Sequence, residues 1–301
     1  MIDWLLCAAR LLQYAAILGL VGAAALGPGA ADWARTRRVP RWVPAAACVG
    51  IAGVALWLAC ESNEIAGTWS AWPTLLWQTR FGRLAGLRAA LLLLAGMTSV
   101  ITADPKRAKV AVGLSSAAAT LSFVWSGHGA MGEGVTRWAH LMCDALHLLA
   151  AAWWLGALAY LSAAAFRLRA EDLVGVELFA HSLARFSRVG PWIVAVLAAT
   201  GLVNSALLLG PHPIAALIRD LYGNLLLVKV ALFALMLLLA AMNRLQLAPV
   251  LHATARLVTG REPTTAAVHS LRISLLVEAL LGLLVLAAVA ILGTLQPPIS
   301  I

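Results

Sequence analysis

Two histidines and one aspartate are spaced so that they share one face of a helix. They lie in the segment HLMCDALHLLAAAWWLG, which begins at His140. At about 100° per residue, His140, Asp144 and His147 fall within an arc of roughly 60°, and Trp154 continues this face. Imidazole suits copper in either oxidation state, so this polar stripe is a candidate metal site. The alternative is structural, with Asp144 paired to an intramembrane Arg and the histidines bonded to backbone or Ser groups.

Three further side chains are candidate ligands for the same site. His128 and Met131 lie in the short connection before His140, and His212 stands between two prolines in a later connection. Thioether sulfur prefers Cu(I), so a mixture of His and Met favours copper over magnesium or calcium. Ordinary packing of Met131 and a solvated loop position for His212 are the alternatives.

Four charged residues interrupt apolar segments: Arg10, Arg88, Lys229 and Glu278. Arg10, Arg88 and Lys229 each lie on the order of 10 Å inside one edge of the membrane, in the same layer as Asp144. We expect at least one of them within salt-bridge reach of Asp144, in an outward vestibule that balances a metal or binds an anion; snorkelling is the alternative. Glu278 is expected in the opposite half of the membrane. It is either a proton or metal relay or an interhelical hydrogen-bonding group.

The cysteines form no CxxC pair, which excludes a zinc ribbon or a thioredoxin-like motif. Cys7, Cys60 and Cys143 are all expected in the same half of the membrane as Asp144. A disulfide, a thiolate ligand and ordinary burial all fit them.

The elements that carry these residues must be membrane-spanning helices. Hydrophobic residues make up 62% of the 301 positions, charged residues 12%, and the mean hydropathy is +0.90. Soluble chains have about 45–50% apolar and about 25% charged residues. We predict an all-α polytopic bundle, a single integral membrane domain over residues 1–301. Its eight spans are expected near residues 4–26, 42–60, 81–103, 108–128, 138–162, 187–210, 222–243 and 272–295.

The basic residues predict the orientation of the bundle. Most of the 22 Lys and Arg residues lie in the connections after spans one, three, five and seven. By the positive-inside rule, both termini face outward, to the periplasm of a bacterial inner membrane. The net charge of +9 is scattered over short connections instead of one basic face, so membrane lipid and not nucleic acid is the expected partner. No phosphate-binding loop, kinase motif set or HExxH motif is present, so an enzyme is not expected.

Several segments resemble the copper resistance protein D family, an inner-membrane group associated with copper uptake. The resemblance covers most of residues 80–298, and its most specific part is the His, Trp and Gly pattern from His140. The family often has a His in its first span, where this chain has RLLQY from Arg10, so the first span is not expected to supply a ligand. The similar segments are SGHGA from Ser126, HLMCDALHLLAAAWWLG from His140, FSRVGPWIVAVLAATGLVNSALLL from Phe186, YGNLLLVKVALFALMLLLAAMNR from Tyr222 and RISLLVEALLGLLVLAAVAILGTLQPP from Arg272.

This resemblance implies copper transport toward the cytoplasm, with a copper ion, Cu(I) or Cu(II), captured at the periplasmic side. It also implies a small periplasmic copper-binding protein as a partner. A haem-binding or electron-transfer membrane protein is one alternative, and a copper-delivery or assembly factor that does not transport is another. The residues that match recurring family positions are His128, His140, Asp144, His147, Lys229 and Glu278.

Overall fold

Eight long helices make up most of the computed structural model, which describes residues 3–26, 42–126, 134–167, 173–209, 220–243 and 261–296, together with residues 217 and 245. All eight are long and apolar enough to cross a membrane, and the described residues form no strand. The all-α, eight-span prediction is therefore confirmed. The helices are α1 (Trp4–Leu26), α3 (Trp42–Ala66), α5 (Arg80–Ile101), α6 (Pro105–Leu121), α7 (Gly134–Arg167), α8 (Leu173–Leu209), α10 (Leu221–Met242) and α12 (Arg261–Leu292).

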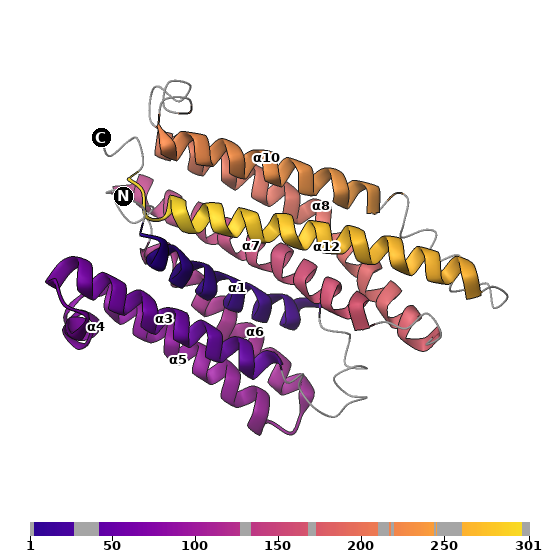
Figure 1. Cartoon of the computed structure of the whole chain (residues 1–301), viewed down its shortest axis with the longest axis horizontal. Helices are drawn as coiled ribbons and strands as arrows, with labels where there is room; N and C mark the ends of the chain where they lie inside the picture. The colour runs from indigo at the N-terminus through magenta and orange to yellow at the C-terminus, as the bar shows by residue number, and fades with distance from the viewer. Residues whose placement is uncertain are drawn as a thin grey trace.

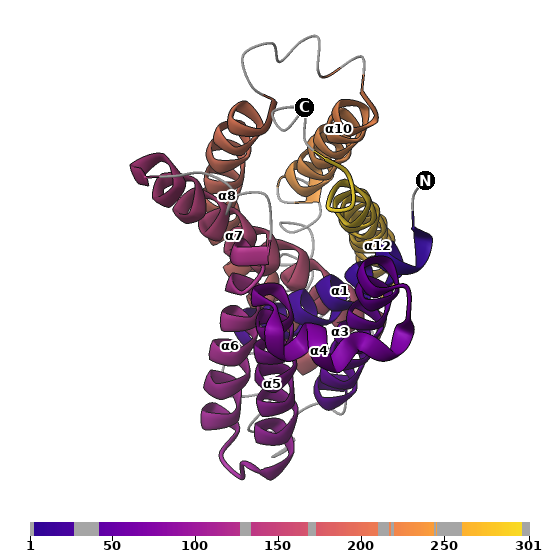
Figure 2. The same ribbon diagram turned by 90° about the vertical axis from the view of Figure 1, so that its left-hand side faces the viewer.

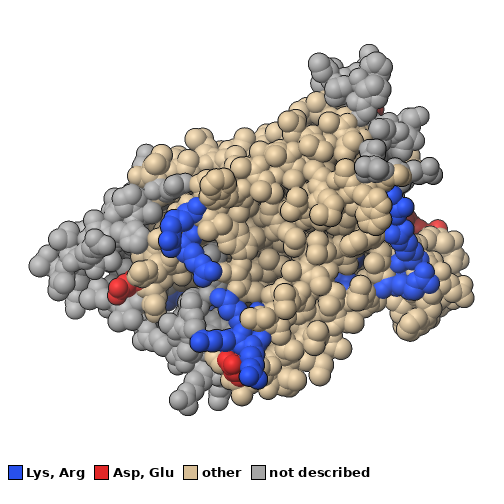
Figure 3. Space-filling view, turned by 180° about the vertical axis from the view of Figure 1, so that it is seen from behind, with Lys and Arg blue, Asp and Glu red and all other residues tan. Residues whose placement is uncertain are grey.

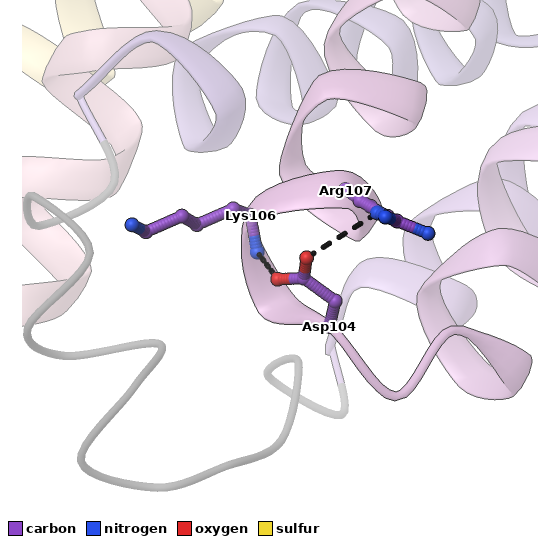
Figure 4. A network of polar contacts seen from close by, with 3 residues as sticks. All are labelled: Asp104, Lys106 and Arg107. Atoms are coloured by element: carbon purple, nitrogen blue, oxygen red, sulfur yellow. Dashed lines mark hydrogen bonds and ion pairs between the residues drawn. The ribbon is translucent and has the colours of Figure 1, made fainter.

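Short elements join some of these helices. The 3-10 turn η1 (Trp69–Ala71) and α4 (Trp72–Gln78) connect α3 to α5, and η2 (Val124–Ser126) follows α6. The start of α6 is fixed by Asp104, whose carboxylate accepts a hydrogen bond of 2.9 Å from the Lys106 backbone N–H and lies 3.5 Å from Arg107 Nε (Figure 4). Asp is a favoured N-cap residue because it satisfies a backbone donor that the helix leaves open.

Three helices are longer than the predicted spans. The helices α7, α8 and α12 have 34, 37 and 32 residues, whereas about 20 cross a bilayer. The extra turns of α8 include Arg185, which lies before the predicted span that begins at residue 187. Helical hydrogen bonds satisfy the backbone in water as well as in lipid, so a helix need not stop where its apolar run stops. Pro191 lies inside α8, between its polar extension and its apolar part.

The first helix lies at the centre of the bundle (Figure 2). It contacts α3 and α6 on one side and α7 and α12 on the other. Each side has its own core: Ile17, Leu20, Val43, Leu92 and Val112 belong to one, and Trp154, Leu158, Phe186, Met236 and Leu275 to the other.

Two glycines let α1 and α7 approach closely. A methyl group added to Gly22 would overlap the backbone of Gly156, and one added to Gly156 would overlap the carbonyl oxygen of Leu18. Small residues at such crossings let helix backbones touch, which is how helices gain packing energy where no hydrophobic effect acts between them. This contact holds α7, the helix with the polar stripe, against the central helix.

The surface follows the pattern expected in lipid. Lys and Arg gather toward the two ends of the bundle, with a broad apolar belt between them (Figure 3). Large apolar side chains on this belt are exposed, among them Leu93, Leu114, Leu202 and Leu284. Because α1 begins and α12 ends at the same end of the bundle (Figure 1), we call it the outer end, after the predicted orientation.

Candidate functional site

The polar stripe of α7 (His140, Asp144 and His147) meets two polar side chains of α8. His147 Nδ1 lies 2.9 Å from the Thr200 hydroxyl oxygen, and Asn204 Nδ2 donates to Asp144 Oδ1 at 3.4 Å. All three stripe residues are half-buried. The stripe therefore lies in the protein interior near the outer end, as polar groups inside a membrane span usually do.

The α8 partners were missed from the sequence. Thr200 and Asn204 are four residues apart in the apolar segment ATGLVNSALLL, so they share one face of their helix. That spacing was a usable signal, because polar residues one turn apart in an apolar span commonly bond a neighbouring helix. Cys143 also faces α8, with its Sγ 3.6 Å from the carbonyl oxygen of Thr200. All four cysteines of the chain are free, so the disulfide alternative is not realised.

Lys229 brings a positive charge to the same site from α10. It lies within electrostatic range of both Asp144 and His147. Between described residues, however, the one ion pair within 4.0 Å joins Arg107 to Asp104. The predicted salt bridge to Asp144 is therefore wrong, because the Asp144 carboxylate is turned toward Asn204 on α8.

Arg88 belongs to a separate network on the other side of α1. It is only 2% exposed, and it donates to Gln13 Oε1 and Ser122 Oγ at 2.9 Å each and to Ser126 Oγ at 3.3 Å. Its guanidinium carbon also lies 3.7 Å from the centre of the Phe123 ring. The prediction of one vestibule shared with Asp144 is wrong for Arg88, because the N-terminal helices form their own core.

Arg10 lies at the outer end of α1, against the end of α12. A methyl group added to Gly293 would overlap Arg10 Nη1. Arg10 also acts electrostatically on Glu61 of α3. Arg10 therefore packs against α12 and lies within electrostatic range of α3, and the salt-bridge prediction fails for it too.

Glu278 forms a fourth polar point, in the inner half of the bundle. It is 1% exposed on α12 and accepts a hydrogen bond from Asn243 Nδ2 at the end of α10. Asn243 Oδ1 is buried and has no hydrogen-bond partner among the described residues. Of the roles expected for Glu278, the geometry realises the interhelical hydrogen bond.

Aromatic rings fill the interior below the polar stripe. Trp154, 3% exposed, continues the face of His147, as expected from their spacing. Its ring centre lies 5.9 Å from that of Phe186 on α8 and 6.2 Å from that of Phe233 on α10, both edge to face. This aromatic cluster therefore joins α7, α8 and α10 on the inner side of His147.

The candidate metal ligands fall partly within and partly outside the described residues. Among them, no group of three or more His, Cys, Asp or Glu is placed to hold one ion. His128, Met131 and His212 lie outside the described residues. The imidazole and carboxylate donors of α7 fit copper chemically, and the structure gathers them beside α8 and Lys229.

Comparison with known proteins gives consistent similarities. The profile of the family described as Copper resistance protein D matches residues 180–292, and that of the Copper resistance protein D-like, N-terminal domain matches residues 1–138. The chain is 37% identical to Copper resistance protein D of Pseudomonas syringae pv. tomato over 221 residues, which are 73% of this chain and 70% of that protein. It is 28% identical to Inner membrane protein YebZ of Escherichia coli (strain K12) over 231 residues, 75% of this chain and 72% of that protein. No solved structure matches the chain significantly.

Proposed function

The chain belongs to the copper resistance protein D family, and we propose that it carries copper across the bacterial inner membrane toward the cytoplasm. It is a multi-pass protein of the inner membrane from a family associated with copper resistance. In this proposal copper is the cargo, and the chain catalyses no covalent reaction.

The observation that carries the proposal is the position of Asp144 and His147 inside a membrane span. Both side chains meet α8 within the protein instead of lying at a watery surface. Ionisable groups at this depth are costly to retain and usually mark a pathway for an ion or a substrate. We propose that copper enters from the outer end and binds the stripe, with His128, Met131 and His212 as further ligands near that end.

Lys229 gives this site a means of accepting and releasing a cation. Its side chain lies within electrostatic range of Asp144, without an ion pair between the two. The positive charge of Lys229 opposes that of an arriving copper ion, which limits how tightly the site holds its cargo. Transport needs a site that binds well enough to capture an ion and loosely enough to release it.

We further propose that a small periplasmic copper-binding protein delivers the ion to the outer end. Inward passage then requires the rings around Trp154 to move and brings copper past Glu278. No ATP-binding motif is present in the sequence, so a copper gradient or a coupled ion drives the movement.

One observation favours a second candidate function, copper delivery without transport. The packed rings of Trp154, Phe186 and Phe233 separate the polar stripe from the inner half, as they would in a protein that only stores copper or hands it on. A haem protein is disfavoured. His140 and His147 are about 10 Å apart along the axis of one helix, so they cannot ligate one iron from opposite sides.

The test measures copper bound per folded protein and copper taken up by sealed vesicles. We expect the His140→Ala, His147→Ala double variant to fold but to lose bound copper and uptake, because Ala is a good helix former and adds no polar group. His181→Ala is the matched control, since His181 is exposed on the polar extension of α8. Unchanged copper stoichiometry in the double variant would refute the site. Copper binding without uptake by the wild-type protein would establish delivery instead, and a Soret band would establish haem.

A further inference from the structure

The hydroxyl group of Thr200 has one hydrogen, and the distances around its oxygen identify the acceptor to which it is donated. Thr200 Oγ1 lies 2.5 Å from the carbonyl oxygen of Val196, one turn earlier in α8. A carbonyl oxygen carries no hydrogen, so two oxygens this close must share the hydroxyl hydrogen of Thr200. The hydroxyl is therefore the donor to Val196, as Thr often is within a helix.

This leaves only one arrangement for the contact with His147. His147 Nδ1 lies 2.9 Å from the same hydroxyl oxygen, whose hydrogen is already used. The hydrogen in this second contact must come from the imidazole, so Nδ1 carries it and donates to Thr200. In a neutral imidazole the other nitrogen, Nε2, then holds the free lone pair.

The backbone of α8 supports this orientation of the ring. The carbonyl oxygen of Leu197 lies 3.4 Å from the Thr200 hydroxyl oxygen, so α8 itself offers this hydroxyl a second backbone acceptor. A methyl group added to Gly201 would lie 3.4 Å from Cε1 and 3.9 Å from Nδ1 of His147. The Nδ1 edge of the ring therefore lies against α8, and Nε2 points away from the Thr200 hydroxyl.

We infer that Thr200 is a positioning residue that holds His147 as the Nδ1–H tautomer and thereby makes Nε2 the copper ligand. The ligand half of this inference rests on the proposed function, whereas the tautomer half does not. Histidines that bind metals commonly donate their other N–H to an oxygen, which fixes the ring and its tautomer, and loss of that partner weakens metal binding by about 10–100-fold.

Two substitutions separate the hydroxyl group of Thr200 from its shape. Thr200→Val keeps the branched side chain but removes the oxygen, and Thr200→Ser keeps the oxygen. The full-length protein is labelled with ¹⁵N-histidine and purified without metal. Its nitrogen spectrum, recorded where imidazole is neutral, distinguishes Nδ1–H from Nε2–H, and the His147 signals are those lost in His147→Ala.

We expect Nδ1–H in the wild-type protein and in Thr200→Ser, and a mixture of tautomers in Thr200→Val. The copper dissociation constant should rise about 10–100-fold in Thr200→Val and change by less than about threefold in Thr200→Ser. A wild-type spectrum with His147 in the Nε2–H form would overturn the inference without any variant, so it stays testable even where Thr200→Val fails to fold. Unchanged affinity in a folded Thr200→Val would overturn the positioning role. Normal copper binding by His147→Ala, with the expected tautomer in the wild type, would instead refute the proposed copper site.

Discussion

Replacing Arg88 with lysine tests whether the buried network of the N-terminal helices depends on the guanidinium group. Arg88 donates three hydrogen bonds in three directions, to Gln13 on α1 and to Ser122 and Ser126 after α6. Lysine keeps the positive charge but has a single ammonium nitrogen in place of the planar guanidinium group. We expect it to keep one of these bonds.

The expected loss follows from the contacts that lysine cannot make. Two hydrogen bonds are lost at about 0.6–1.5 kcal/mol each, a range that includes measurements on interhelical bonds in membranes. Weaker stacking on Phe123 adds up to about 1 kcal/mol. We therefore expect Arg88→Lys to lower the free energy of unfolding by about 1–4 kcal/mol.

Arg107→Lys is the matched control for this substitution. The Arg107 side chain is 84% exposed, and its one ion pair, with Asp104, lies at the surface. Such pairs are worth about 0–1 kcal/mol, and lysine can replace arginine in them. Both variants are unfolded reversibly in mixed detergent micelles with increasing dodecyl sulfate, and the helical circular dichroism signal gives the free energy. Equal stabilities of Arg88→Lys and Arg107→Lys would show that the buried guanidinium is not what holds these helices.

Three further predictions concern packing, the inner polar pair and orientation. Gly156→Val should reduce the yield of folded protein, because the valine side chain has no room against Leu18 of α1. Gly19→Val should have a smaller effect, since no atom lies within 4 Å of a methyl group added there. Equal yields of the two variants would contradict the close crossing of α1 and α7. Glu278→Gln keeps an acceptor for Asn243 and should retain stability, whereas Glu278→Leu should lose about 0.6–2 kcal/mol in the same micelle assay. A C-terminal reporter that is active only in the cytoplasm should give no signal, and a bright reporter would reverse the predicted orientation.

Local sequence determined the spans and the face of α7 that carries the chemistry. Apolar length decides whether a helix can cross a membrane, so all eight spans were predictable from composition along the chain. The helical repeat places His140, Asp144 and His147 on one face regardless of their neighbours. Both properties depend on residues close together in the sequence.

Only the tertiary structure decided which groups these side chains meet. Depth in the membrane suggested that Arg10, Arg88 and Lys229 share a layer with Asp144. Side chains at equal depth meet only if their helices are neighbours, and the sequence does not give the position of each helix around the bundle. The crossing at Gly22 and Gly156 places α1 between the two groups of helices. It thereby separates Arg88 from Asp144. The partners of the stripe, Thr200 and Asn204, come from a helix more than 50 residues further along the chain, and the pairing of such distant residues depends on how helices pack, which the periodicity of either helix alone does not encode.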